Sequence, residues 1–212
     1  MKVGTKSILF GAHCFFIHPW FVFAAWWKLY GFPFDPRLWI AFFVHDLGYF
    51  GKPNMDGEEG ETHVEFGAKV MHLLFDWKKV AGSPYYDLNT GKPVNIYYNI
   101  WGNFLLYHSR FYAKKDNENP SRLCVADKLS ICLEPSWLYL PRVRWSGEIN
   151  EYMKNAENGK YVTMRIPTKS QKEWFKGVQT YLNNWVEEHK DGKTDTWTPE
   201  VKQPINTNGV WQ

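Results

Sequence analysis

Six histidines and aspartates stand among apolar residues between positions 18 and 127. They are His18, His45, Asp46, His63, His108 and Asp127. A buried carboxylate without a partner is costly, and Asp46 and Asp127 both lie where we expect burial. Imidazole and carboxylate groups bind divalent iron, manganese, zinc, nickel or cobalt. A metal centre that faces all six side chains would explain why polar groups occupy these positions.

Each of these residues has a simpler explanation when it is considered alone. A single histidine on an apolar face is more often a core histidine with a hydrogen-bond partner. Asp127 could pair with Lys128, and the dipeptide His45-Asp46 occurs often by chance. The prediction of a metal site therefore depends on all six occurring together, in order. The remaining histidines of the later helices are expected at the surface: His72 and His189.

The composition is typical of a folded globular protein. Hydrophobic residues make up 44% of the 212 residues and aromatic residues 18%, which is ample material for a core. The net charge of +3 is too small to indicate nucleic-acid binding. Three cysteines without a CxxC pair favour a reducing compartment, so we expect a cytoplasmic protein without a disulfide framework.

Helix start signals recur along the chain, and strand signals are few. Asp35-Pro36 predicts a helix that runs to about Leu47, where Gly48 stops it. This helix is apolar almost all round, so we expect it to be central. Further helices are predicted over residues 94–113, from Asn119-Pro120, and from capping boxes at residues 62–65 and 168–171. The first capping box is followed by an apolar stripe of Phe66, Val70, Met71 and Leu74.

The segments between these helices complete the predicted fold. Residues 51–61 and 82–93 are rich in Gly, Pro, Asn and Asp and are predicted loops, and short strands could form near 160–166. We predict an all-α fold with a single domain over residues 1–189. Residues 190–212 are predicted to be an extended polar tail.

Residues 8–27 are nearly all apolar and follow Lys2 and Lys6, as in a signal peptide or membrane span. Two histidines and Pro19 interrupt the run, and no small-x-small cleavage site stands out. We expect a buried helix that lines the site, with a membrane or export segment as the alternative.

The order His…His-Asp…His…His…Asp resembles the HD superfamily of metal-dependent phosphohydrolases. The central pair lies in FFVHDLG, and HPWFVFAA is similar to the family's H-x-x-x-V-x-x-A helix. THVEFGA is similar to its H-x-x-x-G-A motif, LLYHSR carries the next histidine, and SRLCVADKL is similar to its closing A-D-K/R-L helix. The resemblance covers residues 13 to 133.

The resemblance implies an HD-domain helical bundle around a metal centre. One metal would be held by four residues: His18, His45, Asp46 and Asp127. A second would be held by His63 and His108, with Asp46 bridging the two. Iron, manganese, zinc, cobalt or nickel would suit these ligands, and magnesium is also compatible. His13 lies five residues before His18 and is the alternative first ligand, or a proton donor near the leaving group.

The activity that the resemblance implies is hydrolysis of a small phosphoester, such as a nucleotide, by a metal-activated hydroxide. We expect no membrane partner. Basic residues near the metals would bind phosphate, although a solvated surface position is the simpler expectation for each. The candidates are Lys52, Arg110, Lys128 and Arg122. Some branches of the family have an acidic residue or a lysine three positions after the His-Asp pair, whereas this chain has Tyr49.

Two other functions fit the same ligand set. A minority of the superfamily has a similar ligand set but uses two irons and oxygen to cleave C–C or C–P bonds. The other possibility is a non-catalytic helical module with a structural metal, which would require protein ligands to fill every coordination position.

Overall fold

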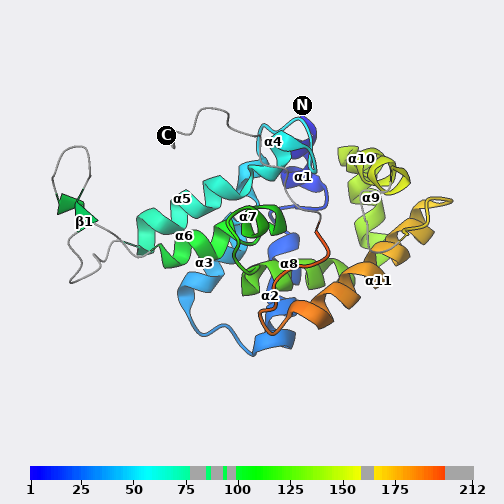
Figure 1. The fold of residues 1–212 in the computed structure, drawn as a ribbon. Helices are drawn as coiled ribbons and strands as arrows, with labels where there is room; N and C mark the ends of the chain where they lie inside the picture. The colour runs from blue at the N-terminus through cyan, green and yellow to red at the C-terminus, as the bar shows by residue number, and fades with distance from the viewer. Residues whose placement is uncertain (77–84, 87–92, 95–98, 159–164, 199–212) are drawn as a thin grey trace, which may run out of the picture.

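The computed structural model describes residues 1–76, 85–86, 93–94, 99–158 and 165–198, and it is an all-α fold (Figure 1). Its helices are α1 (Val3–Phe10), α2 (His18–Tyr30), α3 (Pro36–Val44), the 3-10 helix η1 (Leu47–Tyr49), α4 (Glu58–Glu61), α5 (Val64–Phe75), α6 (Ile100–Leu106), α7 (Arg110–Lys115), α8 (Arg122–Leu133), α9 (Ser136–Ser146), α10 (Glu148–Glu157) and α11 (Gln171–His189). Within the described residues, strands occur only as a short antiparallel pair, β1 (Tyr85–Tyr86) and β2 (Pro93–Val94).

Helix α8 lies at the centre of the bundle, between α2 and α11 (Figure 1). Its buried residues occur all round the helix, as expected for a fully enclosed element. One core cluster joins α8 to α2, α3, α5, α6 and α11, and it includes Phe42, Leu123 and Trp185. A second joins α1 to α9, α10 and α11, and it includes Tyr139, Trp174 and Phe175. The candidate metal ligands lie beside the first core cluster, and the cavity next to them opens toward the second.

Helix α3 is less central than the sequence predicts. Ala41 and Phe42 are fully buried, but Ile40 on the same helix is 37% exposed. The helix also ends at Val44, before the predicted Leu47, and a 3-10 turn follows. The predicted helix end was therefore wrong, because His45 and Asp46 lie in the turn between the two helices.

Gly48 allows a close contact between η1 and the start of α5. A Cβ atom at this position would lie 1.8 Å from the carbonyl oxygen of His63. Its role as a helix stop is therefore wrong, since α3 has already ended. Only a glycine lets η1 approach the start of α5 this closely, and this approach brings the His45-Asp46 turn toward His63.

The helix start signals correctly predicted that helices form, but they identified the capping residues less accurately. Asp35 caps α3 as predicted, since its Oδ1 accepts a hydrogen bond from the Arg37 backbone at 2.9 Å. Ser121 and Ser170 cap α8 and α11, in place of the predicted Asn119 and Thr168. The capping box at residues 62–65 does not form, because the Thr62 hydroxyl donates back to the Glu59 carbonyl.

The predicted apolar stripe of α5 was correct for Met71 and wrong for Phe66 and Leu74. Phe66 and Leu74 are about half exposed, and the buried residues of the helix are Val64, Gly67 and Met71. The core-facing side is rotated because Gly67 packs against the backbone of Val44.

Other segments differ from the predictions in smaller ways. The predicted helix at 94–113 is two helices, α6 and α7, and residues 95–98 lie outside the described residues. The predicted loop at 51–61 contains α4, and the one at 82–93 contains β1 and the start of β2. Short strands were predicted near residues 160–166, and residues 160–164 of that stretch lie outside the described residues.

The apolar run at residues 8–27 forms two helices joined by a turn at residues 11–17. Helix α2 is buried on one side only, since Trp20 is 53% and Trp27 is 55% exposed, so the expectation of a buried helix was only partly correct. Among the described residues, no helix combines the length and the apolar character needed to cross a membrane.

Residues 190–198 follow α11 and pack back onto the bundle. Trp185 donates from its indole nitrogen to Asp195 at 3.1 Å, and Lys114 of α7 donates to the Thr198 carbonyl at 2.6 Å. Trp197 also bonds to Glu188 at 2.8 Å. This segment therefore covers the gap between α7 and α11.

Candidate metal centre

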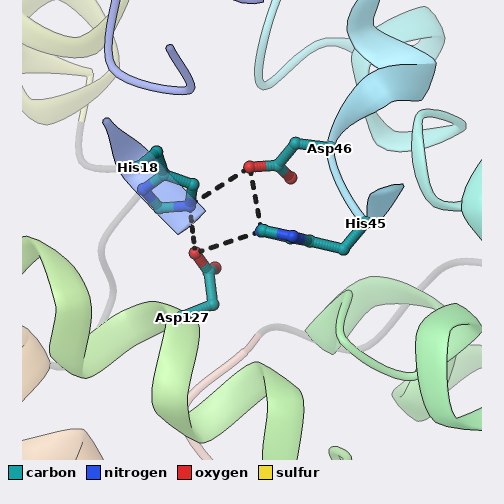
Figure 2. Close-up of side chains that lie close together, drawn as sticks. All are labelled: His18, His45, Asp46 and Asp127. Atoms are coloured by element: carbon teal, nitrogen blue, oxygen red, sulfur yellow. Dashed lines mark hydrogen bonds and ion pairs between the residues drawn. The ribbon is translucent and has the colours of Figure 1, made fainter. Parts of the chain in front are cut away.

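Two groups of buried side chains could each hold a metal ion, and they share one carboxylate. The first group is His18, His45, Asp46 and Asp127, shown in Figure 2. The second is Asp46, His63 and His108. Within each group the ligand atoms lie within 4.8 Å of one another. The structure thus brings together all six residues that the sequence nominates as metal ligands.

Five separate segments supply these side chains. His18 is the first residue of α2, and His63 immediately precedes α5. The turn between α3 and η1 carries His45 and Asp46, and His108 lies in the turn after α6. Asp127 alone lies within a helix, near the middle of α8. Adjacent residues on a regular helix point about 100° apart. His45 and Asp46 converge because both follow the end of α3.

The first group is tightly gathered (Figure 2). His18 Nε2 lies 3.0 Å from Asp127 Oδ1 and 3.2 Å from Asp46 Oδ2. His45 Nε2 lies 3.0 Å from Asp46 Oδ2 and 3.9 Å from Asp127 Oδ1. Two imidazole nitrogens and two carboxylate oxygens therefore surround one point.

The second group uses the other oxygen of Asp46. His63 Nε2 lies 3.7 Å and His108 Nε2 3.6 Å from Asp46 Oδ1. The two imidazole nitrogens lie 3.2 Å from each other. Because Oδ2 faces the first group and Oδ1 faces the second, Asp46 is placed to bridge two cations.

Backbone carbonyls fix the orientation of three imidazoles in the same way. The Nδ1 atoms of His45, His63 and His108 lie 2.9, 2.7 and 2.6 Å from the carbonyl oxygens of Phe42, Gly60 and Leu105, each three residues earlier. A carbonyl oxygen only accepts, so each Nδ1 carries a proton that it donates. In the neutral ring Nε2 then presents a lone pair, which is the usual arrangement of a metal-bound histidine.

A cation fits this arrangement because electron-rich atoms face one another. His45 Nε2 and Asp46 Oδ2 are buried, and neither makes a hydrogen bond within the described part of the chain. His63 and His108 direct Nε2 at each other, and neutral rings with Nδ1 protonated would bring two lone pairs together. A divalent ion in each group would bind these atoms and remove the repulsion.

The pKa values of these groups show how strongly they interact. Burial lowers the pKa of His45, but the negative charges of the nearby Asp46 and Asp127 raise it to about 10. Burial raises the pKa of Asp46, but His45 and His13 hold it well below its usual value. Burial and the neighbouring His108 lower the pKa of His63. His45 therefore takes up a proton when no metal is bound, and metal binding would displace it.

A cavity of about 350 Å³ opens beside the second group. Asp46, His63, His108 and Asp127 form one wall. The remaining lining residues include Met55, Asp56 and Glu61 from the 51–61 segment, Ser109, Arg110 and Phe111 from the start of α7, and Lys128, Tyr181, Trp197 and Thr198. The 51–61 segment thus forms part of the cavity wall.

Two of the four predicted phosphate-binding cations line this cavity. Lys128 lies 2.8 Å from Asp127 Oδ2 and keeps a quarter of its side chain exposed. Arg110 bonds to the Tyr181 hydroxyl at 3.1 Å and lies 5.3 Å from the Trp185 ring centre. Burial lowers the pKa of Arg110, but Tyr181 and Asp195 raise it overall, so the guanidinium keeps its charge.

The other two cations lie elsewhere. Lys52 bonds to the Thr62 hydroxyl and is not among the residues that line the cavity. Arg122 lies 5.1 Å above the Tyr30 ring and lines a different cavity. These placements leave Arg110 and Lys128 as the cations of the metal cavity.

His13 lies at the cavity but outside both ligand groups. Its Nδ1 is 2.8 Å from the Ser7 hydroxyl and 3.4 Å from Glu148 Oε1. Its ring also contacts those of His18 and Tyr49. The geometry therefore places His18, and not His13, in the first ligand group, while His13 lines the cavity wall.

Tyr49 lies three positions after Asp46 and packs beside the second ligand group. Its ring stacks on His63 with 3.8 Å between ring centres and 9° between planes. Burial and the nearby Asp46 raise the pKa of its hydroxyl well above the usual value. Tyr49 thus holds one face of a ligand imidazole and lines the cavity.

The surface prediction was correct for one of the two remaining histidines. His72 is exposed, whereas His189 is 1% exposed and stacks on Trp185 at 4.5 Å. The surface prediction for His189 was wrong because residues 190–198 fold back over the end of α11.

Several cavity residues have no signal in the sequence that could identify them. Tyr181 and Trp197 come from α11 and the segment after it, outside the family-like region. The apolar spacing that includes Tyr181 predicts only that α11 has a buried face. Comparisons with protein-family models, curated proteins and solved structures found no significant match. The assignment of the site therefore depends on its geometry.

Proposed function

We propose that this protein is a metal-dependent phosphohydrolase or phosphodiesterase of the HD type that acts on a small phosphoester such as a nucleotide. The observation that carries the proposal is the pair of buried ligand groups joined by Asp46. They adjoin a cavity that also contains the cations Arg110 and Lys128. A centre built only for structure would not need such an opening or such cations.

The ligand side chains divide the work of holding two ions. His18, His45 and Asp127 would hold the first, His63 and His108 the second, and Asp46 both. Iron, manganese, zinc, cobalt or nickel suits this ligand set. When bound, two divalent ions supply a hydroxide near neutral pH and offset the negative charge of a phosphoryl group.

The cavity residues would bind and orient the substrate. Arg110 can bind phosphoryl oxygens through its planar guanidinium, since only one of its nitrogens bonds to Tyr181. Lys128 holds Asp127 Oδ2, which fixes the carboxylate so that Oδ1 faces the imidazoles. Phe111 and Trp197 line the same cavity and would exclude water from it.

Asp46→Ala is the decisive test of this proposal. We expect the purified wild-type chain to bind close to two divalent ions and to hydrolyse phosphoesters with one of Mn, Fe, Co, Ni or Mg. The variant should lose uptake at both positions together, because both ligand groups need Asp46. Metal content by mass spectrometry and phosphate release would be measured on the same samples.

Asp76→Asn is the matched control. Asp76 is equally buried, but its oxygens accept backbone hydrogen bonds from Trp101 and Gly102 at the start of α6. This variant should lose stability and keep its metal content. Full activity in Asp46→Ala would refute the metal site. Oxygen-dependent turnover without phosphate release would instead support the di-iron oxygenase.

A further inference from the structure

A second cavity of about 190 Å³ continues from the metal cavity. The two share a set of lining residues: His13, Tyr49, Asp56, Glu61, Arg110, Lys128 and Tyr181. The far end is built by α8, α9, α10 and α11 together with Ile166. In Figure 1, α9 and α10 lie across the molecule from α5 and α6, above α11 in this view.

The lining of this second cavity changes character along its length. Its charged residues are those it shares with the metal cavity, together with His18. The remaining residues are Ala12, Ile131, Tyr139, Tyr152, Ile166, Trp174, Val178 and Leu182. A ligand that spans both cavities would therefore present a charged group to the metal centre and an apolar group to the far end.

Aromatic rings dominate the far end. Trp174 and Tyr152 are nearly parallel, with 7° between planes, and Tyr139 is stacked on Phe175. Rings of this kind bind a flat group through stacking and edge contacts. Tyr181 stands at the junction of the two cavities and also bonds to Arg110, so one residue contacts both ends.

Trp174 has a polar atom that no described residue satisfies. The residue is 2% exposed, and its indole Nε1 is buried without a hydrogen-bond partner in the described part of the chain. A buried donor without an acceptor is costly. Trp174 lines the cavity, so a shift of its indole would let an acceptor atom on a bound ligand take this hydrogen bond.

We propose that this second cavity, the aromatic subsite, binds a planar aromatic ring that carries a hydrogen-bond acceptor and belongs to the organic part of the substrate. The inference deepens the proposed function, since the phosphoryl group of the same molecule would lie at the metal centre. A nucleobase and an aryl group share this chemistry. Apart from Ala12, the residues of the far end come after residue 130, outside most of the family-like region.

Binding of unphosphorylated probes to the metal-free chain tests the subsite directly. The probes are adenosine, 2-naphthol and, as a non-aromatic control, glycerol, each titrated calorimetrically in the presence of EDTA. We expect adenosine or 2-naphthol to bind and glycerol not to bind. Adenosine alone would identify a nucleobase subsite and 2-naphthol alone an aryl subsite. If neither aromatic probe binds, or if glycerol binds equally well, the proposal is wrong.

Two substitutions locate the bound ring. Val178→Trp fills the cavity from α11 and should weaken aromatic binding about tenfold or more, a change of roughly 1.4 kcal/mol. Trp174→Phe removes the indole N–H and should weaken adenosine, which has ring acceptors, more than 2-naphthol. Unchanged affinity in Val178→Trp, with normal circular dichroism, would overturn the assignment.

A measurement on the wild-type chain covers the case in which Val178→Trp does not fold. The indole N–H signal of Trp174 in a nitrogen–proton NMR spectrum, identified by its absence in Trp174→Phe, should shift when the aromatic probe is added. A signal that stays in place while the probe binds would refute the subsite. None of these measurements requires metal or turnover, so failure of the subsite and failure of the proposed hydrolysis are distinguishable.

Discussion

His45, His63 and His108 are each oriented by the carbonyl oxygen three residues earlier. This repeated contact explains why a turn, and not the middle of a helix, suits a ligand histidine here. Near a helix end a carbonyl oxygen can accept from a side chain as well as from the backbone, and those of Gly60 and Leu105 do both. The ligands could be predicted from residue type and apolar surroundings. Their tautomers could not, because these depend on local backbone geometry.

Glu148 is a buried carboxylate that accepts several hydrogen bonds. It is fully buried and accepts from Ser7 at 2.6 Å, from the Ala12 backbone at 2.9 Å and from Tyr152 at 3.2 Å. Burial raises the pKa of this carboxyl, but the hydrogen bond and charge of His13, with further hydrogen bonds from Ser146 and Ser7, lower it overall. The ionised form therefore stabilises the fold.

Glu148→Gln should alter the dependence of stability on pH. Because the folded pKa lies below the usual value of 4.5, the carboxylate contributes stability above that pH. The contribution should decline as the pH falls through the folded pKa. We expect the difference in urea unfolding free energy between wild type and variant to be largest near pH 7 and to shrink toward pH 3.

Glu187→Gln is the surface control for this experiment, since its side chain is 70% exposed and pairs only with Lys190. Its difference from wild type should stay small at every pH. A difference for Glu148→Gln that does not change with pH would show that the loss comes from packing and not from the charge.

Gly48 sets the distance between η1 and the start of α5. Gly48→Ala would force its Cβ against the His63 carbonyl, which lies 1.8 Å from that position. We expect a loss of about 1–3 kcal/mol in unfolding free energy, as for other overpacked sites. Metal uptake by the group that contains His63 should weaken as well. Chemical denaturation and metal titration would measure the two effects.

Ala24→Gly in α2 is the comparison variant. Ala24 is exposed, so glycine should cost about 1 kcal/mol through helix propensity alone. This variant should keep the metal affinity of wild type. Equal losses of metal affinity in the two variants would mean that Gly48→Ala acts through general destabilisation and not through His63.

The sequence predicted where helices form better than where they end. Asp35 was correctly identified as a cap, because its capping contact is local. The end of α3 and the buried face of α5 depend on contacts of Gly48 and Gly67 with distant backbone, which no local pattern reveals. The packing of residues 190–198 could not be predicted from the sequence for the same reason, since Asp195 and Thr198 form hydrogen bonds with residues of other elements.

The whole molecule should become more stable when metal is bound. An ion that binds only the folded chain adds about 2.7 kcal/mol of stability at a free concentration of 100 times its Kd. We therefore expect Mn²⁺ to raise the thermal midpoint and EDTA to lower it. Asp46→Ala should show neither response, because both ligand groups contain this residue. If neither Mn²⁺ nor EDTA changed the thermal midpoint of the wild-type chain, the result would contradict the metal site.

At this scale the sequence predicted the all-α class and the six residues that gather in the buried cluster, but not the shape of the cavity. The ligands were recognisable because polar residues on apolar stripes are unusual. The cavity is shaped by side chains such as Tyr139, Tyr181 and Leu182, which are ordinary core residues until the helices are placed around them. The contacts between α11 and α8 and between α9 and α1 decide that placement.

The origin of the ligands in five separate segments has a consequence for folding kinetics. Apart from the neighbours His45 and Asp46, no two of the six are closer in sequence than 17 residues, the separation of Asp46 from His63. A collapsing chain therefore cannot form a strong ion-binding site until distant helices have docked. Metal capture should be a late event, and its rate in a stopped-flow refolding experiment would report when the last helices come together.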